Sequence, residues 1–272
     1  MSAGGPSWRT LRWWIPDLGR IPLRPVFARM CVVRLAGVIS ESCEALLPCL
    51  CLHCGEAIAG DQLGLCGACW PTVVPRAGAA CPRCAAPCDA ELATCLSCES
   101  RAPAQHGTVA WGEYDGALRS AVLGLKARGR DELAEPLGQR LAARIALEDW
   151  ARDVELIGHI PSHPLRSLGR GWPAAASLAR VVGRELGLPV RTLLTRHGLR
   201  RQTGRSRAER AALSRRAFCA AGSMRGWRLL IVDDVTTTGT TLSRAAEALL
   251  AAGADCVFCA AMAVTPDARR AT

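Results

Sequence analysis

Lysine is almost absent from this chain. Lys126 is the only lysine among the 34 basic residues, and arginine supplies all the others. An arginine-favouring, GC-rich genome accounts for that ratio, but the formal net charge of +10 needs a second explanation, such as phosphate-bearing ligands or nucleic acid. Tyrosine and phenylalanine are also scarce, at one and three residues. A surface that stacks nucleic-acid bases would therefore have to be built from tryptophan.

Long apolar runs are missing as well. The best candidate for a membrane span, Cys31–Leu52, is interrupted by Arg34, Glu41 and Glu44. Prolines break up the N-terminal segment, which therefore lacks the layout of a signal peptide. We expect a cytoplasmic protein without a membrane span. We also expect residues 1–45 to be either a poorly ordered arm or the product of an over-long gene model.

Twelve of the fifteen cysteines lie between Cys31 and Cys98. In a reducing compartment such a concentration more often binds metal than forms disulfides. Two CxxC turns together supply four thiolates in a tetrahedral arrangement, which suits zinc. We expect two structural zinc ribbons, with an iron–sulfur cluster, redox chemistry or a metal-free fold as alternatives. The four CxxC pairs are Cys51/Cys54, Cys66/Cys69, Cys81/Cys84 and Cys95/Cys98. The first pair is separated from the second by 11 residues, and the third from the fourth by 10.

From Gly107 onward the pattern changes to alternating strands and helices, which predicts a doubly wound, mostly parallel sheet. We therefore expect a double zinc ribbon over residues 46–103 and an α/β domain over residues 104–272. Residues 196–216, with eight arginines and one acid, fit a loop or a solvated helix. The expected strands are Thr108–Tyr114, Glu155–Ile160, Leu188–Leu194, Leu229–Val232 and Cys256–Val264. The expected helices are Gly116–Gly129, Leu133–Leu147, Ala174–Leu186 and Thr241–Ala252.

The segment Leu229–Leu242 reads LLIVDDVTTTGTTL and carries the strongest functional signal. Asp233 and Asp234 follow an apolar strand, at the edge where ligands bind in open α/β sheets. Two carboxylates there can accept hydrogen bonds from vicinal sugar hydroxyls and orient hydrated Mg²⁺. Backbone N–H groups and hydroxyls at the following helix start form a socket for a phosphate group. The residues of this socket are Thr236, Thr237, Thr238, Gly239, Thr240 and Thr241.

Two other interpretations of this segment are weaker. Helix capping alone would need only one of the threonines, and not the full ordered pattern. A nucleoside triphosphatase would need the lysine of a Walker motif, which is missing here.

At these residues the sequence resembles the type I phosphoribosyltransferases. With its cysteine-rich N-terminal half it resembles the ComF family, the competence-related phosphoribosyltransferase-like proteins of bacteria. The resemblance extends to the Tyr114–Arg119 segment with Lys126, and to Ile160-Pro161 followed by Arg166, Arg170, Gly171 and Trp172. The resemblance also covers Arg196, Gln202, Arg210 and Phe218. It implies that this stretch forms a mobile loop over the active site. The sequence departs from the family pattern at Pro173 and Ala174, where Asn-Gln is usual, and at Leu213, where Asn is usual.

The resemblance implies a ligand and a reaction. The ligand would be phosphoribosyl diphosphate with Mg²⁺, and an incoming nucleophile would displace pyrophosphate from the anomeric carbon. Asp233, Asp234 and Arg170 would then act in catalysis, and Arg166 would help to bind the pyrophosphate. We identify no convincing general base, because an isolated histidine such as His159 or His163 is more often structural.

Two non-enzymatic hypotheses remain open. The ComF resemblance implies a role in DNA uptake during natural transformation, with single-stranded DNA and the DNA-uptake helicase machinery as candidate partners. The positive charge is compatible with such phosphate contacts. Alternatively, the chain is a regulatory protein that senses the sugar diphosphate without turning it over, which the incomplete segment at Pro173 and Ala174 favours.

Overall fold

The structure is a computed structural model that describes residues 49–58, 62–89, 94–127, 130–162, 173–196 and 217–265. The chain divides into two compact units, Met1–Pro48 and Cys49–Thr272, and all described residues belong to the second. The cysteine-rich segment and the α/β segment therefore lie in one unit. The expected boundary between residues 103 and 104, and the nature of residues 1–45, stay predictions.

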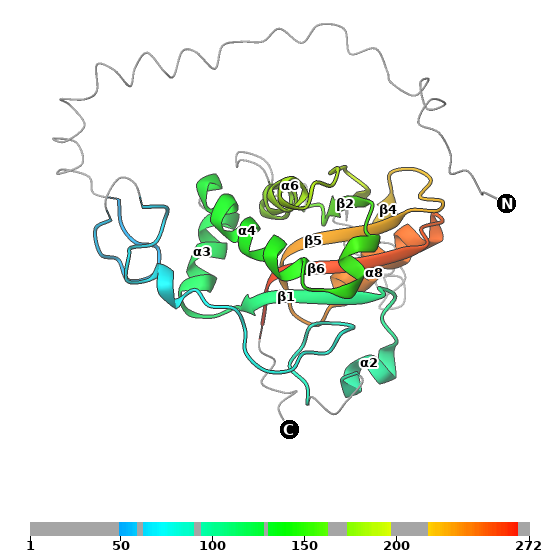
Figure 1. Ribbon diagram of the computed structural model, residues 1–272, viewed down its shortest axis with the longest axis horizontal. Coiled ribbons are helices and arrows are strands. Elements are labelled where there is room, and N and C mark those ends of the chain that lie inside the picture. Colours follow the sequence, from blue (N-terminus) through cyan, green and yellow to red (C-terminus); the bar gives the residue numbers. More distant parts are fainter. Residues whose placement is uncertain are drawn as a thin grey trace, which may run out of the picture. The chain divides into compact units, whose positions relative to one another are not determined.

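Four parallel strands form the central sheet, in the order β1-β6-β5-β2 (Figure 1). Their bounds are Gly107–Glu113 for β1, Leu156–His159 for β2, Arg228–Thr236 for β5 and Cys256–Val264 for β6. The apolar stretch Leu229–Val232 of β5 and nearly all of β6 are buried, as expected for parallel strands that are covered on both faces. A second, antiparallel pair consists of β3 (Leu194–Arg196) and β4 (Phe218–Ala220).

Helices cover both faces of the sheet. The α-helices are α2 (Leu96–Arg101), α3 (Gly116–Ala127), α4 (Ala134–Ile145), α6 (Ala174–Leu186) and α8 (Thr240–Ala251). Short 3-10 helices are η3 (Trp70–Thr72), η4 (Asp131–Leu133) and η5 (Asp149–Asp153). Helices α3, α4 and α6 share one core with Leu230 and Val232 of β5. Helix α8 and the β3–β4 pair share another core with Leu229 and Ile231. The doubly wound α/β fold is thus confirmed.

Two expected strands have different limits in the structure. β5 continues four residues beyond Val232, because β6 runs beside it and pairs Asp233 with Ala261 and Thr236 with Val264. The expected strand Leu188–Leu194 is wrong for most of its length. Val190 forms a single bridge to Ile157, Pro189 before it has no N–H to extend that ladder, and Leu194 already belongs to β3.

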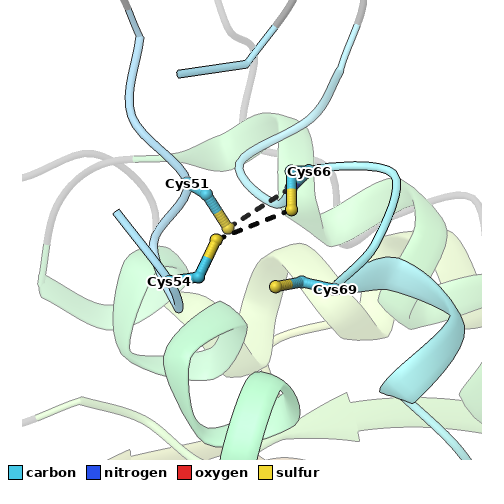
Figure 2. A group of neighbouring side chains, drawn as sticks. All are labelled: Cys51, Cys54, Cys66 and Cys69. Carbon is cyan, nitrogen blue, oxygen red and sulfur yellow. Dashed lines mark hydrogen bonds between the residues drawn. The ribbon is translucent and has the colours of Figure 1, made fainter. Parts of the chain in front are cut away.

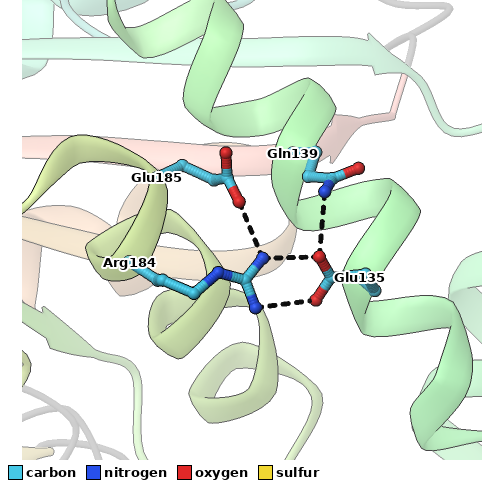
Figure 3. Close-up of polar contacts among 4 residues, drawn as sticks. All are labelled: Glu135, Gln139, Arg184 and Glu185. Carbon is cyan, nitrogen blue, oxygen red and sulfur yellow. Dashed lines mark hydrogen bonds and ion pairs between the residues drawn. The ribbon is translucent and has the colours of Figure 1, made fainter.

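Helices α4 and α6 pack closely against each other and are joined at their surface by one polar network. The guanidinium of Arg184 in α6 donates two hydrogen bonds to the carboxylate of Glu135 in α4, over 3.0 and 2.5 Å (Figure 3). Gln139 donates to the same carboxylate over 2.9 Å, and Arg184 also pairs with Glu185 over 2.7 Å. The Arg184 guanidinium lowers the pKa of the Glu135 carboxyl. The network is exposed, so it contributes more to the alignment of the two helices than to stability.

Candidate functional site

The candidate ligand site lies where β5 ends and α8 begins. β5 ends at Thr236, whose carbonyl accepts a hydrogen bond from the N–H of Thr265 over 3.0 Å. Gly239 then adopts a φ of 71°, a left-handed conformation that glycine takes without strain, and α8 starts at the next residue. The backbone thus turns sharply at the carboxyl edge of the sheet, as the sequence pattern predicts.

The amino end of α8 presents hydrogen-bonding groups to solvent. The side chains of Thr237, Thr238, Thr240 and Thr241 are exposed, whereas Thr236 is buried. The hydroxyls of Thr238 and Thr240 lie 2.8 Å apart, and the first turn of α8 contains no acidic residue. The N–H of Thr240 donates to the hydroxyl oxygen of Thr238 over 3.4 Å, and no carboxylate in the first turn competes for the positive end of the helix dipole. Such an arrangement can bind a phosphate group.

The two adjacent carboxylates leave β5 toward opposite faces of the sheet, because successive residues of a strand alternate. Asp233 lies on the same face of the sheet as Ile231, the face that α8 covers, and is only 8% exposed. Burial, together with the charge of Asp234, raises the pKa of the Asp233 carboxyl well above its usual range. Its Oδ1 accepts a hydrogen bond of 2.8 Å from the N–H of Asp234. Asp233 is therefore fixed from within the fold, with little contact with solvent.

Asp234 points to the other face and meets Lys126. The Nζ of Lys126, in the last turn of α3, lies 2.7 Å from Oδ1 of Asp234. The sequence marks Lys126 only by its uniqueness and by its place in the ComF pattern. The ion pair itself has no sequence signal, because the partners lie on elements that are far apart in the chain.

The expected pyrophosphate segment is described only in part. Arg166, Arg170, His163 and Trp172 lie outside the described residues, so their roles stay predictions. His159 ends β2, and burial lowers the pKa of its imidazole. Its Nδ1 lies 3.4 Å from the carbonyl oxygen of Ile160. These features agree with a structural role for His159.

Cys51, Cys54, Cys66 and Cys69 converge on one point, although the two pairs come from separate turns (Figure 2). All four sulfurs lie within 4.8 Å of one another, and the sulfurs of Cys54 and Cys66 are 3.7 Å apart. Burial raises the pKa of Cys51, but backbone N–H groups of its own turn and of Cys66 outweigh burial and hold the pKa at about 6. The chain therefore favours a thiolate in this cluster.

Cys81, Cys84, Cys95 and Cys98 form a second cluster with the same geometry. The sulfurs of Cys84 and Cys95 are 3.7 Å apart, and the N–H of Cys95 donates to the sulfur of Cys81 over 3.4 Å. A tetrahedral site with Zn–S bonds of about 2.3 Å has S···S edges of about 3.8 Å. The spacing in both clusters fits that value, so each cluster could hold one zinc ion.

The two clusters contact different parts of the α/β segment. In the first, Leu52 packs against Gly124 of α3 and against Leu133. In the second, Pro82 accepts a 2.7 Å hydrogen bond from the N–H of Thr108 in β1, and the carbonyl of Arg83 accepts one of 2.8 Å from the same threonine's hydroxyl. The second cluster is thereby fixed at the start of β1, beside the turn into α8.

Comparison with known proteins identifies the domain. A family model described as a phosphoribosyl transferase domain matches residues 168–271. The DNA utilization protein YhgH of Salmonella typhimurium is 29% identical over 219 residues, which cover 76% of this chain and 93% of the relative. YhgH of Escherichia coli K12 is 27% identical over 222 residues, which cover 78% and 95%. The similarity therefore spans most of both chains.

Solved structures with related folds are more distant. A glutamine phosphoribosylpyrophosphate amidotransferase from B. subtilis aligns with 52% of this chain at 22% identity and a TM-score of 0.40. This chain spans 30% of that enzyme. A purine phosphoribosyltransferase from Pyrococcus horikoshii aligns with 58% of this chain at 16% identity and a TM-score of 0.28, and 78% of that protein is covered.

Among the described helices, none is both long and apolar enough to cross a bilayer. The family match covers residues 168–271, which include β5 and the threonine loop, and the YhgH relatives match most of the chain. The chain has a type I phosphoribosyltransferase fold with a phosphoribosyl transferase domain, and it is similar over most of its length to the YhgH proteins.

Proposed function

We propose that this chain binds phosphoribosyl diphosphate at the carboxyl end of β5, in a process of DNA uptake or utilization. The observation that carries the proposal is the direct succession of an acidic pair, a threonine turn and a helix start at the edge of a parallel sheet. The terminal phosphate of the sugar would occupy the turn over Thr237–Thr241, where N–H groups and hydroxyls converge. The ribose hydroxyls would then reach the acidic pair through Asp234, the more exposed of its two carboxylates.

The acidic pair suits a sugar better than a bare metal ion. Divalent cations prefer several carboxylate oxygens that are free to converge on one point, whereas Asp234 is already ion-paired with Lys126 and Asp233 is buried. The Mg²⁺ expected from the sequence is therefore not held by this pair alone. We propose that it enters with the diphosphate, whose charge it neutralises.

Transfer of the phosphoribosyl group is the reaction that this ligand suggests. The bond between the anomeric carbon and its oxygen would break and pyrophosphate would leave, with the predicted contacts from Arg166 and Arg170. A nucleophile would attack the same carbon, through a transition state that positioning and charge stabilise. Among the described residues near the site, His159 is half-buried and its Nδ1 lies next to the carbonyl oxygen of Ile160, so we assign it no role as a base.

Calorimetric titration of the full chain with phosphoribosyl diphosphate and Mg²⁺ tests the proposal. We expect binding that falls at least tenfold when Asp233→Ala and Asp234→Ala are combined. Asp255→Asn is the matched control, because Asp255 is an exposed carboxylate just before β6, at the amino end of the parallel strands, whereas the turn lies at their carboxyl end. If the wild-type chain does not bind the ligand, the proposal is wrong. Release of pyrophosphate in the same mixture separates an enzyme from a sensor that only binds.

A second candidate function is direct contact with single-stranded DNA, which the name of the curated relatives supports. Arg196 ends β3 and lies over the ring of Phe218, with 5.5 Å between its guanidinium carbon and the ring centre. Arg200 and Arg201, also candidates from the sequence, lie outside the described residues. Salt-sensitive binding of an oligonucleotide that weakens when all three arginines are neutralised would support this function. Binding that is indifferent to salt would argue against it.

A further inference from the structure

The ion pair between Lys126 and Asp234 holds a positive charge inside the candidate sugar site. Nζ and Oδ1 are 2.7 Å apart, and the two side chains are 36% and 13% exposed. Lys126 lies in the last turn of α3, where unpaired carbonyls favour a cation. Two independent features, the helix end and the carboxylate, therefore fix the ammonium at one position.

Lysine contacts the carboxylate differently from arginine. A guanidinium tends to bind both oxygens of a carboxylate in a fork, as Arg184 does with Glu135 (Figure 3). The ammonium of Lys126 is a compact charge that touches Oδ1 of Asp234, so Oδ2 can still accept a hydrogen bond from a hydroxyl. The ammonium also has three protons, of which the ion pair uses one. In a chain with 33 arginines, 34 − 1, the single lysine stands where this difference matters.

The charges of the site are nearly balanced without a metal. Asp234 and Lys126 neutralise each other, and Asp233 lies on the opposite face of β5, buried beside Cys259. Burial raises the pKa of Asp233, which reduces its negative charge further. A phosphate at the start of α8 would therefore meet little repulsion from the acidic pair.

We propose that Lys126 is the built-in counter-ion of the acidic pair, and that it positions Asp234 for the ribose hydroxyls so that the ribose phosphate half of the ligand binds without a divalent cation. The inference rests on the proposed function and deepens it, since it assigns Mg²⁺ to the diphosphate half alone. Lys126 is a positioning residue: it orients the carboxylate that meets the sugar.

The test is calorimetric titration of the full chain with ribose 5-phosphate, once with EDTA and once with Mg²⁺. For the wild type we expect dissociation constants that agree within about twofold. For Lys126→Met we expect binding at least tenfold weaker in EDTA, because Asp234 loses its counter-ion, and partial recovery with Mg²⁺, which supplies the missing charge. Arg119→Met is the matched control: it removes one charge from the same helix, at a residue that lies over the ring of Tyr114.

Recovery of Lys126→Met with Mg²⁺ also shows that this variant is folded, and a second variant tests whether Mg²⁺ acts through Asp234. Lys126→Met combined with Asp234→Asn removes both charges, so we expect weak binding that Mg²⁺ does not restore. A wild type that needs Mg²⁺ for ribose 5-phosphate, or a Lys126→Met variant that binds like the wild type in EDTA, would overturn the role of Lys126. In that case binding of phosphoribosyl diphosphate with Mg²⁺ would still leave the proposed function standing. Failure of the wild type to bind either ligand would overturn both.

Discussion

Cys84, in the second cysteine cluster, lies directly against Gly239, which begins the turn into α8. A β-carbon placed on Gly239 would be 3.4 Å from the β-carbon of Cys84. The N–H of Ala104 also donates to the hydroxyl of Ser243 in α8 over 3.1 Å. A small cavity of about 120 Å³ between these segments is lined by residues of both, including Cys98 and Arg244. The second cluster thus supports the loop that we propose for phosphate binding.

Loss of the second cluster should therefore weaken ligand binding more than loss of the first. We expect Cys84→Ser with Cys98→Ser to remove one of two zinc ions and to weaken ribose 5-phosphate binding at least tenfold in the presence of Mg²⁺. Cys54→Ser with Cys66→Ser should also remove one zinc ion, but should change that binding less than threefold, because its cluster packs on α3. Elemental analysis and calorimetry measure the two quantities. Equal losses of binding in the two variants would contradict this division of roles.

Substitution of Gly239 tests the same contact from the other side. Gly239→Ala places a methyl group against Cys84 and forces alanine to a φ of 71°, which costs roughly 1–2 kcal/mol. We expect a comparable loss in the free energy of unfolding and weaker ribose 5-phosphate binding, as the turn shifts. Gly222→Ala, which meets no atom within 4 Å, is the control. Unchanged binding in Gly239→Ala would mean that the turn tolerates displacement.

The sequence predicts an element best when residues within the element or next to it set its limits. Helix α6 has the expected bounds because Pro173 precedes it and Gly187, with a φ of 68°, closes it. Strand β6 also has its expected bounds, because it is an apolar run buried on both faces. In both cases the signal lies within the element or beside it.

Features that depend on distant partners could not be predicted. The length of β5 is set by its pairing with β6, and the opposite directions of Asp233 and Asp234 follow from that length. The short β3–β4 pair has three residues in each strand, too few for a periodic pattern. The contacts of Lys126 with Asp234 and of Cys84 with Gly239 likewise arise only when separate elements pack.

Asp233 should make stability depend on pH. Burial and the charge of Asp234 raise its pKa in the folded chain, so the native state retains a proton that the unfolded state has lost. Stability therefore falls as pH rises from the ordinary aspartate value of about 3.9 through the raised folded value. Asp233→Asn keeps an acceptor for the Asp234 N–H but cannot ionise. We expect it to be more stable than the wild type at pH 8, with a difference that grows as pH rises from 5.5, and to bind ribose 5-phosphate poorly.

Urea unfolding between pH 5.5 and 8.5 measures this difference. Asp255→Asn serves as the control, since it makes the same substitution at an exposed aspartate. If Asp233→Asn were less stable than the wild type at pH 8, the carboxylate would be stabilised by its surroundings, and our account of the acidic pair would be wrong.

The contact between α4 and α6 depends on a glycine that leaves room for a valine. A β-carbon on Gly138 would lie 2.5 Å from the β-carbon of Val181, which is too close to the backbone of α6 to move away. Gly138→Ala should therefore separate the helices and destabilise the fold by about 1–3 kcal/mol. This loss in the free energy of unfolding exceeds the gain of about 0.5–1 kcal/mol that replacing glycine by alanine normally gives within a helix. Chemical denaturation measures the difference in the free energy of unfolding between Gly138→Ala and the wild type, and Gly222→Ala serves as the control. If Gly138→Ala were more stable than the wild type, the helix packing would relax easily and the prediction would be wrong.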